Sequence, residues 1–170
     1  MEHVAETLDI GPGTRVYQVA CGRGAFLQPL YDNGYVVGGL DASELLIQEA
    51  GAAMPMGRWS IGEAASLDPG DPWDVVVAVG AFACFPDLDY ARGILARMAA
   101  KATHAVAVLD VPDLDRRGPA PAAGLWYDRG WMLRALAEIG ASAVQLEDQR
   151  IEHYEAGRTR FNVFARLSNP

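Results

Sequence analysis

Several acidic residues and glycines directly follow apolar runs of the chain, in positions where they could hold a polar ligand. Asp41 ends the run YVVGGLD, and a carboxylate at such a place can accept charge-assisted hydrogen bonds from two neighbouring hydroxyl groups. Gly22 and Gly24 follow the run RVYQVA, and their missing Cβ atoms let the backbone approach a ligand closely. Together these residues predict a binding site for a polar small molecule at the ends of the two runs.

A second group of acids offers a different chemistry. Asp110, Asp113 and Asp115 lie in the stretch LDVPDLD, at the end of another apolar run. A carboxylate beside a pocket can act as a general base and accept a proton from a substrate, so all three are candidate catalytic residues. The alternative is that they lie on a solvated loop, an interpretation that applies to Asp113 and Asp115 more than to Asp110.

The histidines and cysteines do not indicate a metal site. His3, His104 and His153 lack the spacing of metal ligands. His104 stands near the start of an apolar run, which favours a structural role, whereas His153 precedes the last run and could approach a substrate. Cys21 and Cys84 make neither a disulfide framework nor a zinc pattern, and we expect them to be buried or to line a pocket.

The elements that must position these residues alternate between strands and helices. Runs such as DVVVAV and THAVAVL are almost wholly apolar, as in parallel strands that helices cover on both faces. The predicted strands are Val16–Val19, Tyr35–Leu40, Trp59–Ile61, Trp73–Val79, Thr103–Leu109, Ala143–Glu147 and Arg160–Leu167, and the predicted helices are Met1–Leu8, Gly24–Asn33, Ser43–Ala50, Leu88–Ala100 and Asp128–Ile139. This pattern predicts one α/β domain over residues 1–170, with a doubly wound, mostly parallel Rossmann-like sheet and an antiparallel hairpin of the last two strands at one edge.

Composition and charge exclude several classes of protein. The chain has 170 residues and a formal net charge of −8, and it has no basic run for neutralising phosphates, which argues against nucleic-acid binding. No run reaches the ~18 apolar residues of a transmembrane helix. The acidic start MEHVAETLDIGPG does not look like a signal peptide, so we expect a cytoplasmic protein.

The order of these features resembles the class I S-adenosylmethionine-dependent methyltransferases, over about residues 13 to 167. The chain has their glycine turn, their acids after the next two strands, an apolar strand with the aromatic exit FPDLDYARGILARM, and a terminal hairpin. The exit is similar to that of small-molecule methyltransferases of bacterial secondary metabolism. The resemblance implies that Asp41 binds the ribose, that Glu63 and Ala64 contact the adenine, and that Gly80 faces the methyl group or the amino-acid end. The cofactor-binding residues that it implies are Gln18, Ala20, Gly22, Gly24, Asp41, Glu63, Ala64 and Gly80.

The glycine turn departs from the family pattern of acid-x-Gly-x-Gly-x-Gly. Gln18 replaces the acid and Ala20 replaces the first glycine. A glutamine brings no charge, and the loss of one charge-assisted hydrogen bond costs on the order of 1.5–3 kcal/mol. The exit VGAFACF also has no polar side chain beyond one thiol. We therefore keep two hypotheses: a methyltransferase that acts on a small metabolite, or a methyltransferase-like protein that no longer uses S-adenosylmethionine.

The second hypothesis includes two forms. The chain would act in a heteromer, either as the non-catalytic partner or in a cofactor-independent displacement or cyclisation with an aspartate as base. A nicotinamide-dependent oxidoreductase is a third interpretation, which the terminal hairpin and the FPD exit disfavour. Because few residues precede the first strand, we expect the loop Pro112–Gly124 with Trp126, Tyr127 and Trp131, or a second chain in a homodimer or heteromer, to cover the pocket.

Overall fold

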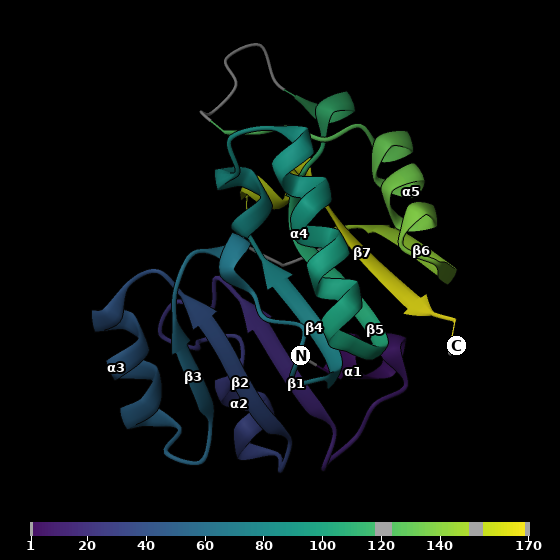
Figure 1. The fold of residues 1–170 in the computed structure, drawn as a ribbon. Coiled ribbons are helices and arrows are strands. Elements are labelled where there is room, and N and C mark those ends of the chain that lie inside the picture. Colours follow the sequence, from purple (N-terminus) through teal and green to yellow (C-terminus); the bar gives the residue numbers. More distant parts are fainter. Residues whose placement is uncertain (1, 118–123, 150–154, 169–170) are drawn as a thin grey trace.

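The computed structural model describes residues 2–117, 124–149 and 155–168, which form one seven-stranded sheet with helices on both faces (Figure 1). The strand order is β3-β2-β1-β4-β5-β7-β6. The strands β1 to β5 pair in parallel, and β7 lies antiparallel between β5 and β6. Their bounds are Arg15–Val19 (β1), Val36–Asp41 (β2), Arg58–Ile61 (β3), Trp73–Val79 (β4), Ala102–Pro112 (β5), Ala141–Asp148 (β6) and Arg160–Leu167 (β7). The predicted α/β sheet and its antiparallel edge hairpin are confirmed.

Two apolar clusters fix the helices to the two faces of the sheet. The helices α4 and α5 pack on one face, whereas α1, α2 and α3 pack on the other. Their bounds are Glu2–Leu8 (α1), Gln28–Asp32 (α2), Glu44–Ala53 (α3), Leu88–Lys101 (α4) and Arg129–Glu138 (α5). Short 3-10 turns connect them at Ala64–Ser66 (η1), Ala81–Cys84 (η2), Leu114–Arg116 (η3) and Glu155–Thr159 (η4). None of the described helices combines the length and the apolar composition that crossing a bilayer requires.

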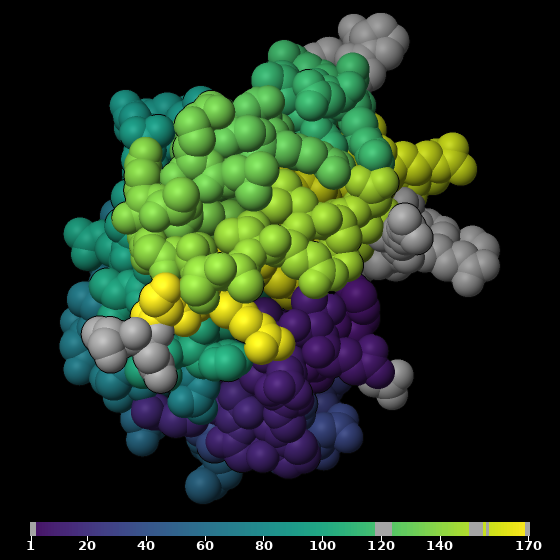
Figure 2. All heavy atoms as spheres, turned by 90° about the vertical axis from the view of Figure 1, so that its right-hand side faces the viewer, coloured from purple at the N-terminus to yellow at the C-terminus, as the bar shows by residue number. Residues whose placement is uncertain are grey.

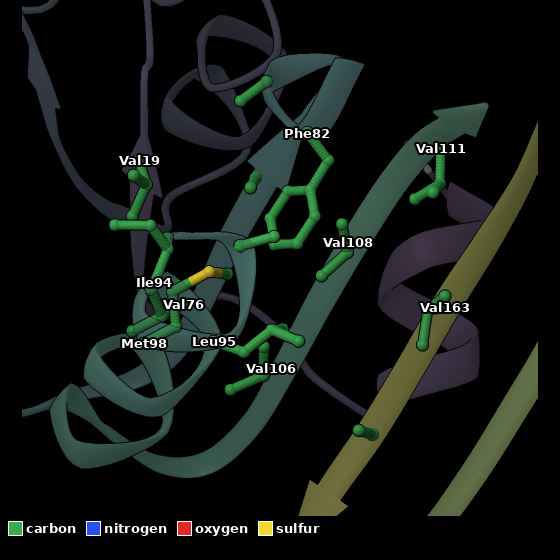
Figure 3. Packing of buried hydrophobic residues seen from close by; sticks show 14 of the residues in the cluster. Val19, Val76, Phe82, Ile94, Leu95, Met98, Val106, Val108, Val111 and Val163 are labelled. Carbon is green, nitrogen blue, oxygen red and sulfur yellow. The ribbon is translucent and has the colours of Figure 1, made fainter. Parts of the chain in front are cut away.

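The centre of the core is the contact between α4 and the middle strands (Figure 3). Val75 to Ala78 of β4 have no exposed surface, because helices cover both faces of this strand. On the α4 side, Ile94, Leu95 and Met98 are buried at 2% exposure or less. This packing explains why the run DVVVAV is apolar without alternation. It also holds the ends of β4 and β5 rigidly, and those ends carry Gly80 and Asp110.

The helix predicted over Gly24–Asn33 is wrong at its start, because α2 covers only Gln28–Asp32. Gly22 and Gly24 have φ angles of +54° and +80°, which an α-helix does not allow. Residues 21 to 27 instead form successive turns, in which the Gly24 N–H donates to the Cys21 carbonyl and the Leu27 N–H to the Gly24 carbonyl. A Cβ on Gly24 would lie 2.3 Å from Cε of Met54, which would have to move, and the φ of Gly24 itself favours glycine. No helix begins directly at the glycine turn.

Two of the three aromatic residues predicted to cover the pocket, Tyr127 and Trp131, belong to the core instead, whereas Trp126 is partly exposed. Tyr127 has no exposed surface and Trp131 is 7% exposed. The Tyr127 hydroxyl donates a 2.9 Å hydrogen bond to the Phe82 carbonyl, and this bond holds η2 in place. The predicted loop begins later than expected, since β5 extends through Pro112 and η3 follows it. Residues 118–123 of that loop, and His153, lie outside the described residues.

Candidate functional site

Three neighbouring strands each turn, at or near their carboxyl ends, through a residue in the left-handed conformation. Ala20 follows β1 with φ +53°, Gly80 follows β4 with φ +67°, and Asp110 lies near the end of β5 with φ +60°. For a residue with a Cβ this conformation costs roughly 1–2 kcal/mol, so the surrounding structure must impose it. Such strain clusters at ligand sites, and in open α/β sheets ligands bind beside the carboxyl ends of the strands. The search for a site therefore starts at this edge.

A cavity of about 700 Å³, here called the Asp41 cavity, lies at this edge. It brings together five of the eight residues that the sequence predicted for cofactor binding, namely Ala20, Asp41, Glu63, Ala64 and Gly80. The other three do not line it. The Gly22 N–H donates a hydrogen bond to Asp41, Gly24 lies against Met54, and Gln18 is buried in the sheet.

Backbone groups hold the Asp41 carboxylate at the end of β2. Its Oδ2 accepts a hydrogen bond from the Gly22 N–H at 2.8 Å, and its Oδ1 accepts one from the Ser43 N–H at 2.9 Å. Each carboxylate oxygen keeps further acceptor capacity. The buried Cys21 thiol lies nearby, and burial, reinforced by the Asp41 charge, raises its pKa to about 12. The Asp41 carboxylate is therefore oriented in advance, and it can accept two further hydrogen bonds from a ligand.

The opposite wall of the Asp41 cavity is aromatic. Phe85 and Tyr90 line it, with ring centroids 5.1 Å apart, and Phe82 stacks behind Phe85 at 4.8 Å. The Tyr127 hydroxyl and the Leu125 N–H hold the carbonyls of η2 at 2.9 Å each. This wall suits a flat apolar ring. The sequence analysis used the FPDLDY stretch for its resemblance but did not name Phe85 and Tyr90 as site residues. It did expect Cys84 to be buried or to line a pocket, and Cys84 lines this one.

Gln18 contributes an unsatisfied acceptor beneath the glycine turn. Its side chain is 4% exposed, and its Oε1 has no hydrogen-bond partner among the described residues. A buried acceptor without a partner costs about 1–3 kcal/mol. Gln18 lines neither of the two cavities described here, so this acceptor lies inside the sheet.

The three candidate catalytic aspartates do not lie together. The Asp110 carboxylate faces Gly80, with its Oδ2 3.6 Å from the position that a Cβ on Gly80 would take. Asp113 is fully buried and accepts hydrogen bonds from Arg129 Nε at 2.9 Å and Nη2 at 2.7 Å. Asp115 is exposed on η3. Asp110 therefore lies beside Gly80, which lines the Asp41 cavity, whereas Asp113 lies in an ion pair. Neither aspartate is among the residues that line the two cavities described here.

A second cavity of about 690 Å³ lies on the other side of the β4 end, and we call it the Phe26 cavity. Phe26, Leu109 and Asn162 line it together with His3 of α1, and Val79 lines both cavities. Figure 2 shows α1 lying against β6, where His3 Nε2 and Glu147 Oε1 are 2.6 Å apart. The sequence did not reveal this cavity, because its wall comes from segments that are far apart in the chain. No group of three or more His, Cys, Asp or Glu side chains with metal-binding geometry exists in the described part of the chain.

No protein-family model matches the chain, and no curated protein matches it significantly in sequence. Solved structures do match its fold. CalS10, an amino pentose methyltransferase of calicheamicin biosynthesis from Micromonospora echinaspora, superposes with a TM-score of 0.79 at 16% identity over 98% of this chain and 89% of its own. The magnesium protoporphyrin IX methyltransferase ChlM from Synechocystis, with bound SAM, gives 0.73 at 20% identity over 98% and 77%. A TehB-like SAM-dependent methyltransferase from Corynebacterium glutamicum gives 0.70 at 18% identity over 98% and 86%. The chain therefore has the fold of the class I methyltransferases.

Proposed function

We propose that this chain binds S-adenosylmethionine in the Asp41 cavity and transfers its methyl group to a small molecule. The observation that carries the proposal is the fixed carboxylate of Asp41, held by two backbone N–H groups in one cavity with Glu63 and Gly80. The methyltransferase fold supports it, as does the bound SAM in the structures of ChlM and CalS10.

The residues present fit the adenosyl part of the cofactor. The Asp41 carboxylate would accept hydrogen bonds from the two ribose hydroxyls, which are charge-assisted and therefore strong. Phe85 and Tyr90 would pack against the adenine ring, and Ala64 and Glu63 line the same cavity. Gln18 stands where the family pattern has the acid that helps to hold the ammonium group, but its side chain is buried and does not line the Asp41 cavity. Because Gln18 is neutral, we expect weaker binding than with an acid at this position.

The chemistry needs positioning more than acid–base catalysis. The cofactor supplies a methyl group on a positively charged sulfonium, which is an electrophile without further activation. The chain would orient the acceptor for in-line attack, and such positioning can contribute roughly 7–11 kcal/mol to the acceleration. We assign Asp110 as the group that accepts the proton of the acceptor, because its carboxylate lies beside Gly80, which lines the Asp41 cavity. Asp113 is not assigned this role, since its carboxylate holds Arg129.

In this proposal the methyl acceptor is a small metabolite. More specifically, we propose that it is a precursor in natural-product biosynthesis. CalS10 acts on an amino pentose in calicheamicin biosynthesis, and ChlM acts on a magnesium porphyrin. The two acceptors differ greatly in size and shape, so the fold alone does not select one. The walls of this chain's own cavities must do so.

A second candidate is a methyltransferase-like protein that no longer uses the cofactor. Ala20 places a methyl group in the Asp41 cavity where the family pattern has a glycine, and Gln18 is uncharged. In addition, α2 begins four residues after Gly24, so no helix N-terminus supports the turn. In this form Asp110 would serve as the base in a cofactor-independent displacement, or the chain would support a catalytic partner.

Thermal unfolding with two ligands separates these functions. S-adenosylhomocysteine and NAD⁺ are added to the purified chain at the same millimolar concentration. A ligand at about 100 times its Kd stabilises the folded state by about 2.7 kcal/mol, which gives a measurable rise in Tm. We expect a rise with S-adenosylhomocysteine and none with NAD⁺. No rise with either would favour the second candidate, and a rise with NAD⁺ alone would contradict both.

A further inference from the structure

The Phe26 cavity adjoins the proposed cofactor site and is the place for a second ligand. Val79, the last residue of β4, lines both cavities, so their contents would meet at the end of this central strand. Its inner wall is apolar and is formed by Phe26, Val79 and Leu109. Its polar side comes from the end of the β6–β7 hairpin. A molecule in this cavity would therefore have an apolar body and a polar group at one end.

A chain of amide hydrogen bonds fixes what the polar side offers. The Asp110 backbone N–H can only donate, and it donates to Asn162 Oδ1 at 3.0 Å. The orientation of the Asn162 amide is thereby set, and its Nδ2 donates to Gln149 Oε1 at 3.3 Å. Asn162 is 8% exposed, which excludes most solvent from this chain of bonds. The Gln149 side-chain NH₂ is consequently the end of the chain, and it has no protein acceptor among the described residues.

The charged side chains around the cavity are paired with one another and leave no net positive charge. Glu147 pairs with His3 at 2.6 Å. Asp148 pairs with Arg116 and Arg129, each at 2.7 Å. The two arginines are matched by Asp148 and the buried Asp113, so this group as a whole is neutral. The described residues that line the cavity include no lysine or arginine, so none of them would compensate the charge of a negatively charged ligand.

We propose that the Phe26 cavity holds the methyl acceptor, and that this acceptor is a neutral or cationic molecule with an apolar body and an oxygen that accepts a hydrogen bond from the Gln149 amide. The role of this ligand as methyl acceptor rests on the proposed function, whereas its chemical class rests on the residues of the cavity alone. Phosphorylated and carboxylated metabolites are excluded by it. Phenols remain, as do amines and alcohols with an apolar body that carry such an oxygen.

The test uses two probes of one shape. 2-Naphthamide and 2-naphthoate share the ring system and a carbonyl oxygen, but only the second is an anion. Each is titrated into the isotopically labelled full chain, and backbone amide shifts of Phe26 and Leu109 report binding in this cavity. We expect 2-naphthamide to bind there and 2-naphthoate to bind about tenfold more weakly, because its charge finds no partner. Equal or tighter binding of 2-naphthoate would overturn the inference.

Two variants examine the donor. Gln149→Ala should weaken 2-naphthamide binding about three- to tenfold, the value of one neutral hydrogen bond. Leu133→Ala, on the exposed face of α5, removes a similar amount of side chain far from the cavity and should change nothing. If Gln149→Ala binds as the wild type does, the assigned donor is wrong.

A parallel titration with S-adenosylhomocysteine separates the two proposals. If S-adenosylhomocysteine binds but 2-naphthamide does not, the ligand class is wrong and the proposed function stands. If 2-naphthamide binds selectively but S-adenosylhomocysteine does not, the ligand class stands and its role as methyl acceptor is wrong.

Discussion

The Gly22 N–H donates a 2.8 Å hydrogen bond to the carboxylate of Asp41 and so ties the glycine turn to the end of β2. The two residues are 19 positions apart in sequence, and each is placed by its own strand of the parallel pair β1–β2. One oxygen of Asp41 thus shapes the turn while the carboxylate faces the cavity. If the proposed function is right, the same side chain holds both the protein and the ligand in place.

Asp41→Asn keeps the size of this side chain but removes its charge. The amide must present its NH₂ to the N–H of either Gly22 or Ser43, so one of the two supporting bonds is lost. We expect the affinity for S-adenosylhomocysteine to fall about ten- to hundredfold, as for the loss of a charge-assisted hydrogen bond. Calorimetric titration measures this. Asp89→Asn, an exposed acid in the first turn of α4, is the matched control and should bind as the wild type does. Unchanged affinity in Asp41→Asn would remove Asp41 from the site.

Ala20→Gly should stabilise the protein. Ala20 has a φ of +53°, which costs an alanine roughly 1–2 kcal/mol, whereas glycine adopts it freely. The greater freedom of glycine in the unfolded chain offsets part of this gain, which leaves a net stabilisation of about 0.5–1 kcal/mol. Urea unfolding measures the change. Because Ala20 lines the Asp41 cavity, the variant should also bind S-adenosylhomocysteine more tightly. A less stable variant would mean that the backbone strain is not present in solution.

The sequence predicted the central strands well because their apolar composition reflects their burial. β4 has the predicted bounds, and α4 and α5 begin within one residue of their predicted starts, each after an aspartate that caps it. The helix predicted from Gly24 was wrong because the sequence does not reveal the positive φ angles of Gly22 and Gly24, which an α-helix does not allow. Five of the eight expected cofactor residues share a cavity, since parallel strands bring their ends together.

The candidate base and the Phe26 cavity show what the sequence could not predict. The motif LDVPDLD contains three similar acids, and only the structure reveals that the Asp113 carboxylate is paired with Arg129. That pairing joins residues 16 positions apart across a turn, and no spacing rule indicates it. The Phe26 cavity combines α1, the glycine turn, β5 and the β6–β7 hairpin, so no local pattern marks it.

Asp113→Asn should lower the stability of the protein, whereas Asp110→Asn should lower its methyl-transfer activity. The first leaves Arg129 without its buried partner charge, and breaking a buried ion pair costs about 3–5 kcal/mol. It should lower the free energy of unfolding while leaving S-adenosylhomocysteine affinity unchanged below the unfolding transition. The Asp110→Asn variant should bind S-adenosylhomocysteine as the wild type does. With an identified acceptor, it should transfer the methyl group more slowly. Denaturant unfolding and calorimetry on both variants check the assignment. If Asp113→Asn were as stable as the wild type, the ion pair would not be structural.

Acid should weaken the hydrogen bonds that hold the end of β6. The hydrogen bonds from Arg129 and Arg116 lower the pKa of Asp148 below its ordinary value. The unfolded chain therefore takes up this proton at a higher pH than the folded one does, so the contribution is present at neutral pH and is lost as the pH falls below about 4. Asp148→Asn should show a shallower loss of stability over this range than the wild type. Urea unfolding at a series of pH values measures it, and parallel curves for the two proteins would show that the ion pairs contribute nothing.

The two cysteines should differ in reactivity. Cys84 is exposed and lines the Asp41 cavity, whereas Cys21 is buried and burial raises its pKa to about 12. The thiolate is the reactive form, so at pH 8 iodoacetamide should modify Cys84 alone. Mass spectrometry of the digested protein locates the label. S-adenosylhomocysteine should slow this reaction by covering Cys84, and a free amino acid such as methionine at the same concentration should not. Equal labelling with and without S-adenosylhomocysteine would place that ligand outside this cavity.

The most direct test of the central claim is calorimetric titration of the purified wild-type chain with S-adenosylhomocysteine and S-adenosylmethionine. The fixed Asp41 carboxylate and the aromatic wall predict a single site with a Kd in the range of about 1–100 μM, equivalent to about −8 to −5.5 kcal/mol. Circular dichroism on the same sample confirms that the chain is folded. Binding in this range would show that the site accepts the cofactor in spite of Gln18 and Ala20. A folded chain that binds neither compound at millimolar concentration would contradict the account.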